Sequence, residues 1–177
     1  MGRIVYDVPL VTQAANPICW VACMAMVASE RQQMSVGVGN FAGGFDPSNA
    51  SITTDITGVD WNLTNRLLAN AGFAQASINP KADELESALR LQGPIIFNHF
   101  CAGFPYGPGW APITDPNAAH AIVITGYDSS VNGGQCWMNN PWGNKDRMLP
   151  LSAVITAINK WLTATTLVGW QISYWNR

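Results

Sequence analysis

The chain has 177 residues, of which 48% are hydrophobic and 11% are charged, and its formal net charge is −2. A chain of this length can bury a substantial core, and we expect a single domain over residues 1–177. The small net charge gives no support to a nucleic-acid partner. The longest apolar run, Cys19 to Ala28, has half of the roughly 20 residues that a membrane span needs, so no span is expected.

The N-terminal half is predicted to be mainly helical. Residues 4–12 are typical of a short strand or an extended arm, and Asn16-Pro17 is a typical helix start because proline is favoured in the first turn. The helix that follows has a predicted buried stripe at helical spacing, formed by Trp20, Cys23, Met24 and Val27.

A Gly- and Ser-rich stretch over residues 36–58 predicts a long surface loop, which in a compact domain is often functional. Further helices are predicted around residues 63–71, ending at Gly72, and within residues 79–94, ending at Gly93-Pro94. The apolar positions of these two helices are Leu63, Leu67, Leu68 and Ala71, then Leu85, Ala88 and Leu89.

The C-terminal half is predicted to be mainly antiparallel strand. Residues 95–100 and 120–128 are typical of buried strands, and residues 135–143 of a return strand after the turn at 129–134. A short helix is predicted from Leu151, Val154, Ile155 and Ile158, and a half-buried strand from the alternation of Val168, Trp170, Ile172 and Tyr174. This order predicts an α+β fold, with an N-terminal helical half packed on a C-terminal antiparallel β-sheet.

Cys19 is the candidate nucleophile. In the first turn of its helix, the partial positive charge of the helix N-terminus would favour the thiolate. On position alone a buried core cysteine is the alternative, and Cys23, one turn further, is interpreted as core. The four cysteines form no CxxC pair and the chain has only two histidines, so neither a metal site nor a cofactor is predicted.

A thiol nucleophile needs a base, and the histidines are His99 and His120. A hairpin centred near residue 131 would pair His120 with about residue 142, which brings Asn140 beside it. The Asn140 carbonyl would then accept an imidazole N–H, and Trp142 would shield that bond from water. His99 has no such partner in its own strand, and a hydrogen-bonded core histidine is the alternative interpretation of His120.

These residues together resemble the papain-like cysteine peptidases. The matching pieces are Gln13 six residues ahead of Cys19, Trp20 directly after it, HAIVITGYD with His120, and NPWG from Asn140. The small size and the YDVPLVTQ lead-in are most similar to the compact bacterial type, which includes AvrRpt2-type effectors and bacteriocin-leader peptidase domains. The resemblance implies a papain-like fold in which Cys19 attacks, His120 transfers protons and Asn140 orients His120. It also implies that the Gln13 side chain and the Cys19 backbone N–H form an oxyanion hole.

The sequence therefore predicts a thiol hydrolase that cleaves a peptide or protein substrate, in the context of a bacterial effector or toxin with an immunity or inhibitor protein as partner. One alternative uses the same machinery for deamidation, transglutamination or peptidoglycan amide cleavage. The other is a non-enzymatic papain-like peptide-binding module, against which the intact set of Gln13, Cys19 and His120 argues. MGRIVYDVPL lacks the apolar segment of a Sec signal, so we expect either a cytoplasmic protein or export by a specialised secretion system.

Overall fold

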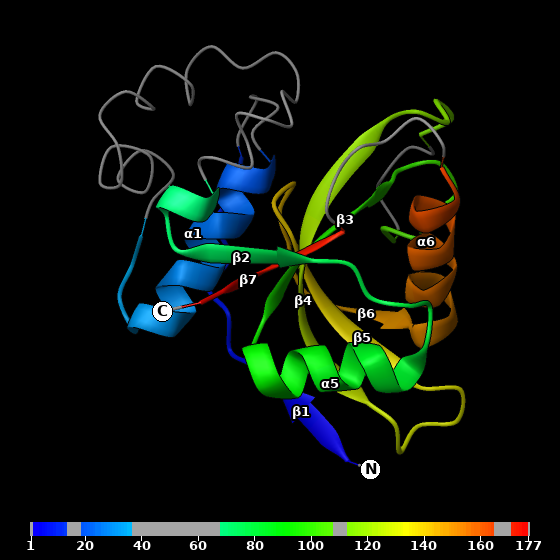
Figure 1. Cartoon of the computed structure of the whole chain (residues 1–177), viewed down its shortest axis with the longest axis horizontal. Coiled ribbons are helices and arrows are strands. Elements are labelled where there is room, and N and C mark those ends of the chain that lie inside the picture. Colours follow the sequence, from blue (N-terminus) through cyan, green and yellow to red (C-terminus); the bar gives the residue numbers. More distant parts are fainter. Residues whose placement is uncertain (1, 14–18, 37–67, 108–112, 165–170, 177) are drawn as a thin grey trace.

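The computed structural model describes residues 2–13, 19–36, 68–107, 113–164 and 171–176. Its elements are β1 (Arg3–Val5), α1 (Cys19–Gln32), β2 (Phe73–Ala76), α5 (Ala82–Gln92), β3 (Ile95–Phe100), β4 (Ala119–Asp128), β5 (Gln135–Asn140), β6 (Asn144–Pro150), α6 (Leu151–Thr163) and β7 (Ile172–Trp175). The strands form one antiparallel sheet in the order β2-β7-β3-β4-β5-β6, and β1 pairs with β4 (Figure 1).

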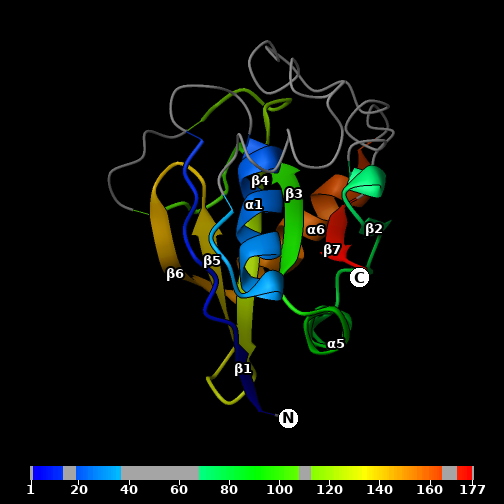
Figure 2. The ribbon, with the colours of Figure 1, turned by 90° about the vertical axis from the view of Figure 1, so that its left-hand side faces the viewer.

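Successive residues of the central strands face opposite sides of the sheet, as the period of a strand requires. One side packs on α1 through Ile96, Ala121 and Val123. The other side packs on α5 and α6 through Ile95, Phe97, Ile122 and Ile124. Figures 1 and 2 show α1 on one side of the sheet and α6 on the other. The predicted packing of an N-terminal helical part on an antiparallel sheet is confirmed.

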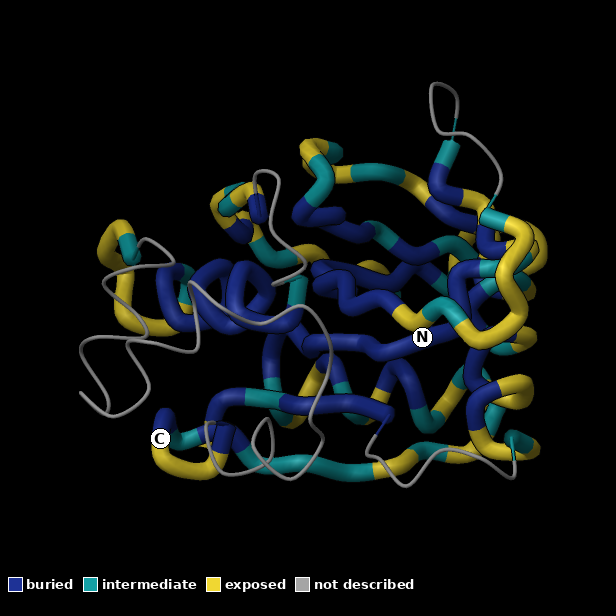
Figure 3. The backbone as a smooth tube through the Cα atoms, turned by 90° about the horizontal axis from the view of Figure 1, so that it is seen from above, coloured by how far each residue is buried: buried dark blue, intermediate teal, exposed yellow. Residues whose placement is uncertain are grey.

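Helix α1 is buried on every side and not only along the predicted stripe (Figure 3). All residues from Trp20 to Ser29 are buried, including the four of the stripe. Apolar residues from other segments pack in the same cluster as α1, namely Val8, Leu68 and Ala71, together with Phe73 of β2 and Trp175 of β7. A helix that is apolar all round needs such cover. None of the helices in the described ranges is long and apolar enough to cross a membrane.

Glycine ends two of the predicted helices at the expected places. Gly72 follows the helical turn at residues 68–70 with φ +84°, and Gly93 follows α5 with φ +81°. Both angles lie in the left-handed region that glycine adopts without steric cost. Leu63, Leu67 and the predicted loop beyond Val36 lie outside the described residues.

Strand β7 differs from its prediction. Ile172, Ser173 and Trp175 are all buried, so the strand is not half-buried with one solvent face. Both of its edges are paired, with β2 and β3, and both of its faces are covered, since Trp175 belongs to one core cluster and Ile172 to the other. Val168 and Trp170 lie outside the described residues. Strands β2 and β6 were not predicted, because β2 is short and β6 is mostly polar.

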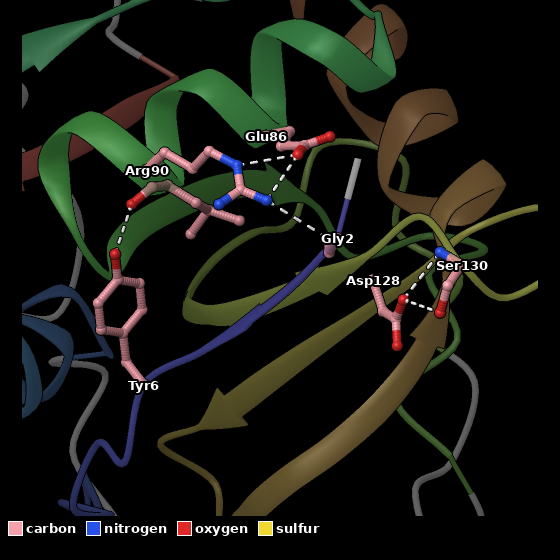
Figure 4. A network of polar contacts seen from close by, with 7 residues as sticks. Gly2, Tyr6, Glu86, Arg90, Asp128 and Ser130 are labelled. Carbon is pink, nitrogen blue, oxygen red and sulfur yellow. Dashed lines mark hydrogen bonds and ion pairs between the residues drawn. The ribbon is translucent and has the colours of Figure 1, made fainter.

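The N-terminal arm, residues 2–13, is fixed along the sheet and on α5 (Figure 4). The Tyr6 backbone N–H donates to the Thr125 carbonyl at 2.8 Å, and the Tyr6 hydroxyl donates to the Leu89 carbonyl at 2.8 Å. Arg90 of α5 donates to the Gly2 carbonyl at 3.4 Å. The arm that leads to Gln13 is therefore held by the rest of the fold.

Candidate active site

Cys19 is the first residue of α1 and is half-buried, whereas the residues that follow it are buried. The backbone of Ala121, the residue after His120 on β4, lies close enough to the thiol to lower its pKa. The structure therefore brings the predicted nucleophile to the strand that carries the predicted base. The predicted helix start at Asn16-Pro17 lies outside the described residues. Cys23 is fully buried, as expected of a core residue.

His120 and Asn140 meet across the β4–β5 hairpin, as the strand count predicts. Val123 pairs with Asn139, and continuing this register past Val123 places His120 opposite Trp142. The Nε2 atom of His120 lies 2.9 Å from Oδ1 of Asn140, and both residues are buried. A bulge between Ile124 and Gly126 shifts the register by one residue on the turn side without separating the pair.

The hydrogen bonds of Asn140 determine which nitrogen of His120 carries a proton. Oδ1 of Asn140 also accepts the backbone N–H of Trp142 at 3.0 Å, so the group at this point is the carbonyl oxygen and not the amide nitrogen. His120 must therefore donate from Nε2, which leaves Nδ1 as the basic nitrogen of the neutral ring. The Trp142 indole stacks on the imidazole, with 3.8 Å between ring centroids and 16° between planes. This indole shields the hydrogen bond from water.

A second aromatic group encloses His120 and was missed by the sequence analysis. Tyr106 lies 5.8 Å from His120 and 5.0 Å from Trp142 between ring centroids. It comes from the loop after β3, where no periodic pattern could indicate its position. The ring limits the space in which His120 can turn, so Tyr106 helps to hold the imidazole on Trp142.

His99 has a hydrogen-bond partner from outside its own strand. It is fully buried and pairs directly with His120 between β3 and β4, and its Nε2 lies 2.7 Å from the Tyr106 hydroxyl. Burial, and then the neighbouring His120, hold the pKa of His99 well below its usual range. A neutral, fully buried imidazole bonded to Tyr106 packs in the core, where Phe104 also contacts it.

Gln13 reaches the same place from the N-terminal arm. Its backbone N–H donates to the Pro141 carbonyl at 2.9 Å, and the residue is buried. Pro141 directly follows Asn140, so the end of β5 connects Gln13 with the His120 pair. Cys19 lies near Ala121, the residue next to His120 on β4.

The electrostatics of the pair differ from the sequence prediction. Burial raises the pKa of the Cys19 thiol to about 11, and the Ala121 backbone offsets this only in part. Burial also lowers the pKa of His120 to about 4, against the opposing effect of the Asn140 bond. Burial thus favours the neutral thiol and the neutral imidazole, and it opposes the helix N-terminus, which was expected to favour the thiolate.

Comparisons with known proteins concern the family and the fold of the chain. A family model described as papain-like cysteine protease AvrRpt2 matches residues 3–156. A search of curated proteins found no match.

Two solved structures illustrate the shared fold. One comes from work on the limited antibody cross-reactivity between the mite allergens Blo t 1 and Der p 1, and is similar with a TM-score of 0.58 at 12% identity over 100% of this chain and 71% of that chain. The other is digestive procathepsin L 3 of the Tenebrio molitor larval midgut, with a TM-score of 0.59 at 11% identity over 98% of this chain and 69% of that chain. At these identities the structural similarity shows the fold alone. The family match over most of the chain shows the family: the chain is a cysteine peptidase that belongs to the papain-like cysteine protease family of AvrRpt2.

Proposed function

We propose that the chain hydrolyses peptide or amide bonds with Cys19 as nucleophile, His120 as acid and base, Asn140 as the orienting group and Gln13 as an oxyanion-hole donor. The main support is the hydrogen bond between His120 and Asn140. Because Oδ1 of Asn140 also accepts the Trp142 backbone N–H, His120 must donate from Nε2, and Nδ1 is left as the basic nitrogen. A base needs this defined tautomer before it can take a thiol proton.

The reaction begins when the Cys19 proton moves to Nδ1 of His120 and the sulfur attacks the substrate carbonyl carbon. The C=O electrons move onto oxygen, and the Gln13 side chain and the Cys19 backbone N–H stabilise the resulting anion. The oxyanion then collapses, the C–N bond breaks, and the proton on Nδ1 passes to the leaving amine. The acyl group stays on sulfur as a thioester.

Deacylation repeats these steps with water. His120 takes a proton from the water molecule, whose oxygen attacks the thioester carbonyl. The C–S bond breaks, the thiolate recovers the proton, and the carboxylic acid leaves. The ring keeps its orientation throughout, because Nε2 stays bonded to Asn140 while only Nδ1 exchanges protons.

The second candidate function uses the same acyl-enzyme with a different donor or acceptor. Deamidation releases ammonia from a side-chain amide, transglutamination passes the acyl group to an amine, and peptidoglycan amide cleavage acts on a cell-wall peptide. A non-enzymatic peptide-binding module is less well supported, because such a module has no use for a buried imidazole held in one tautomer beside a thiol.

Peptide-library profiling by mass spectrometry tests these candidates together. A hydrolase should give two fragments from a susceptible peptide, a deamidase the mass of a converted side chain, and a transglutaminase a cross-linked product. The Cys19→Ala variant is the matched control and should give none of them. Binding of peptides without any turnover by the unmodified protein would refute the enzymatic proposal.

The proposed context is a bacterial effector or toxin that acts on a peptide or protein substrate and is restrained by an immunity or inhibitor protein. The support is the resemblance to AvrRpt2-type effectors. The protein would act in the cytoplasm or leave the cell through a specialised secretion system. Expression in a susceptible host tests this: the unmodified chain should impair growth and Cys19→Ala should not. Equal growth with both chains would contradict a toxic role.

A further inference from the structure

Two adjacent asparagines end strand β5, and their side chains serve different parts of the site. Asn140 bonds His120, while Asn139 donates from Nδ2 to the Val8 carbonyl at 2.8 Å. Neighbouring residues of a strand point to opposite faces, so the two amides are kept apart. Asn139 is fully buried, and its bond spans 131 residues of sequence to reach the N-terminal arm.

The orientation of the Asn139 amide is fixed from its other end. Oδ1 of Asn139 accepts the backbone N–H of Asp146 at 2.8 Å. Asp146 lies where the β5–β6 register shifts, and its φ of 52° is in the left-handed region. Because Oδ1 faces this N–H, Nδ2 must face Val8. The side chain therefore joins the arm, β5 and the irregular part of β6.

The arm is held again at Gln13, whose backbone N–H donates to the Pro141 carbonyl at 2.9 Å. Residues 139–141 thus fix both ends of the segment from Val8 to Gln13. A surface contact on the same arm is different in kind: Lys145 pairs with Asp7 at 3.0 Å, but the Asp7 side chain is 92% exposed. Exposed ion pairs hold a chain weakly, whereas a buried amide with both ends bonded holds it firmly.

We propose that Asn139 is a positioning residue for Gln13. It fixes the arm at Val8, so that the side chain of Gln13 is directed to the oxyanion position beside Cys19. This inference rests on the proposed function, in which Gln13 stabilises the oxyanion. The end of β5 then positions two groups of the site: Asn140 orients the base His120, and Asn139 orients the oxyanion-hole donor Gln13.

A double-mutant cycle tests the inference, using Asn139→Ala, Gln13→Ala and the double variant on a fluorogenic peptide taken from the library profile. Gln13→Ala should lower kcat by about 10²–10³, the usual effect of one oxyanion-hole donor. Asn139→Ala should lower kcat about tenfold or more with little change in KM. In the Gln13→Ala background the same substitution should change kcat by less than about threefold, because its effect passes through Gln13.

Two readouts separate positioning from a general structural role. Alkylation of Cys19 by iodoacetamide forms no oxyanion and should keep its unmodified rate in Asn139→Ala. Amide hydrogen exchange over residues 9–13 should become faster in that variant, since the segment loses one of its two anchors. Asp7→Asn is the matched control on the same arm and should change neither kcat nor the exchange rate.

Equal losses of kcat from Asn139→Ala in both backgrounds would overturn the inference, because Asn139 would then act independently of Gln13. A parallel loss of Cys19 alkylation would also overturn it, since the effect would pass through His120. If Gln13→Ala retains full activity, the proposed oxyanion role itself fails, and exchange over residues 9–13 still decides whether Asn139 anchors the arm. Should Asn139→Ala not fold, Asn139→Asp keeps the shape and the acceptor for Asp146 but loses the donor to Val8, and it replaces Ala throughout the cycle.

Discussion

The Cys19–His120 pair should give an unusual pH profile for alkylation of Cys19. A thiol beside a neutral imidazole and a thiolate beside an imidazolium contain the same number of protons, so pH does not change their ratio between the two outer pKa values. Burial sets these limits at about 4 for His120 and about 11 for Cys19. The rate with iodoacetamide should therefore be nearly constant from about pH 5 to about pH 7, and above that range direct loss of the thiol proton to solvent adds to it. The alkylation rate of an ordinary thiol, with a pKa near 8.5, would rise about 10³-fold between about pH 5 and 8.

His120→Ala should restore an ordinary dependence on pH, because the thiolate then forms only by losing its proton to solvent. The alkylation rate should fall below that of the unmodified protein at pH 7 and rise about tenfold per pH unit toward about 11. Intact-mass spectrometry with peptide mapping measures the rate at each cysteine. Cys23, Cys101 and Cys136 are buried and serve as internal controls. A tenfold rise per unit from about pH 5 to about pH 7 in the unmodified protein, or faster labelling of Cys101 or Cys136 than of Cys19, would refute the reasoning.

Gln13→Ala should lower kcat and kcat/KM together by about 10²–10³, while the rate of Cys19 alkylation stays unchanged. Hydrolysis at the unmodified rate would refute the oxyanion-hole role of Gln13. Asn140→Ala should slow hydrolysis less than loss of the nucleophile, and Asn140→Asp should retain part of the activity because a carboxylate accepts the same N–H; two harmless substitutions would contradict the orienting role. Folding stability should fall as the pH drops from about 6.5 toward 4, because burial lowers the pKa of His120 to about 4 and also holds that of His99 low, so the unfolded chain binds these protons first. For His120 alone the loss between pH 7 and 5 is about 2 kcal/mol. Urea unfolding at both pH values measures it, and equal stabilities would contradict burial of the uncharged rings.

The meeting of His120 with Asn140 could be predicted because it depends on local information. The turn residues 129–134 fix the centre of the hairpin, and alternation along each strand then fixes which residues face each other. The bulge near Ile124 shifts the β4–β5 register by one residue. Such a shift is small enough for the side chains of His120 and Asn140 still to meet. The end of α5 at Gly93 was predictable for the same reason, since a glycine is needed where φ is positive.

Features that depend on distant segments could not be predicted in this way. Tyr106 has no periodic neighbours to indicate that it packs on His120. Asn139 is a polar residue in a strand, and its sequence neighbours do not indicate that its amide reaches Val8. The burial of β7 depends on distant segments: its edges pair with β2 and β3, which precede it by more than 70 residues, and its faces pack into the two core clusters.

The sequence by itself determined the residue types, their order along the chain and the hairpin that joins His120 to Asn140. These follow from short-range rules of turn chemistry, strand period and helix ends. Only the tertiary structure decided how burial shifts the pKa values of Cys19 and His120, because a pKa depends on how much water the surrounding segments exclude. It also decided how Gln13 reaches the site, since the N-terminal arm is placed by contacts with strands that lie more than 100 residues further along the chain.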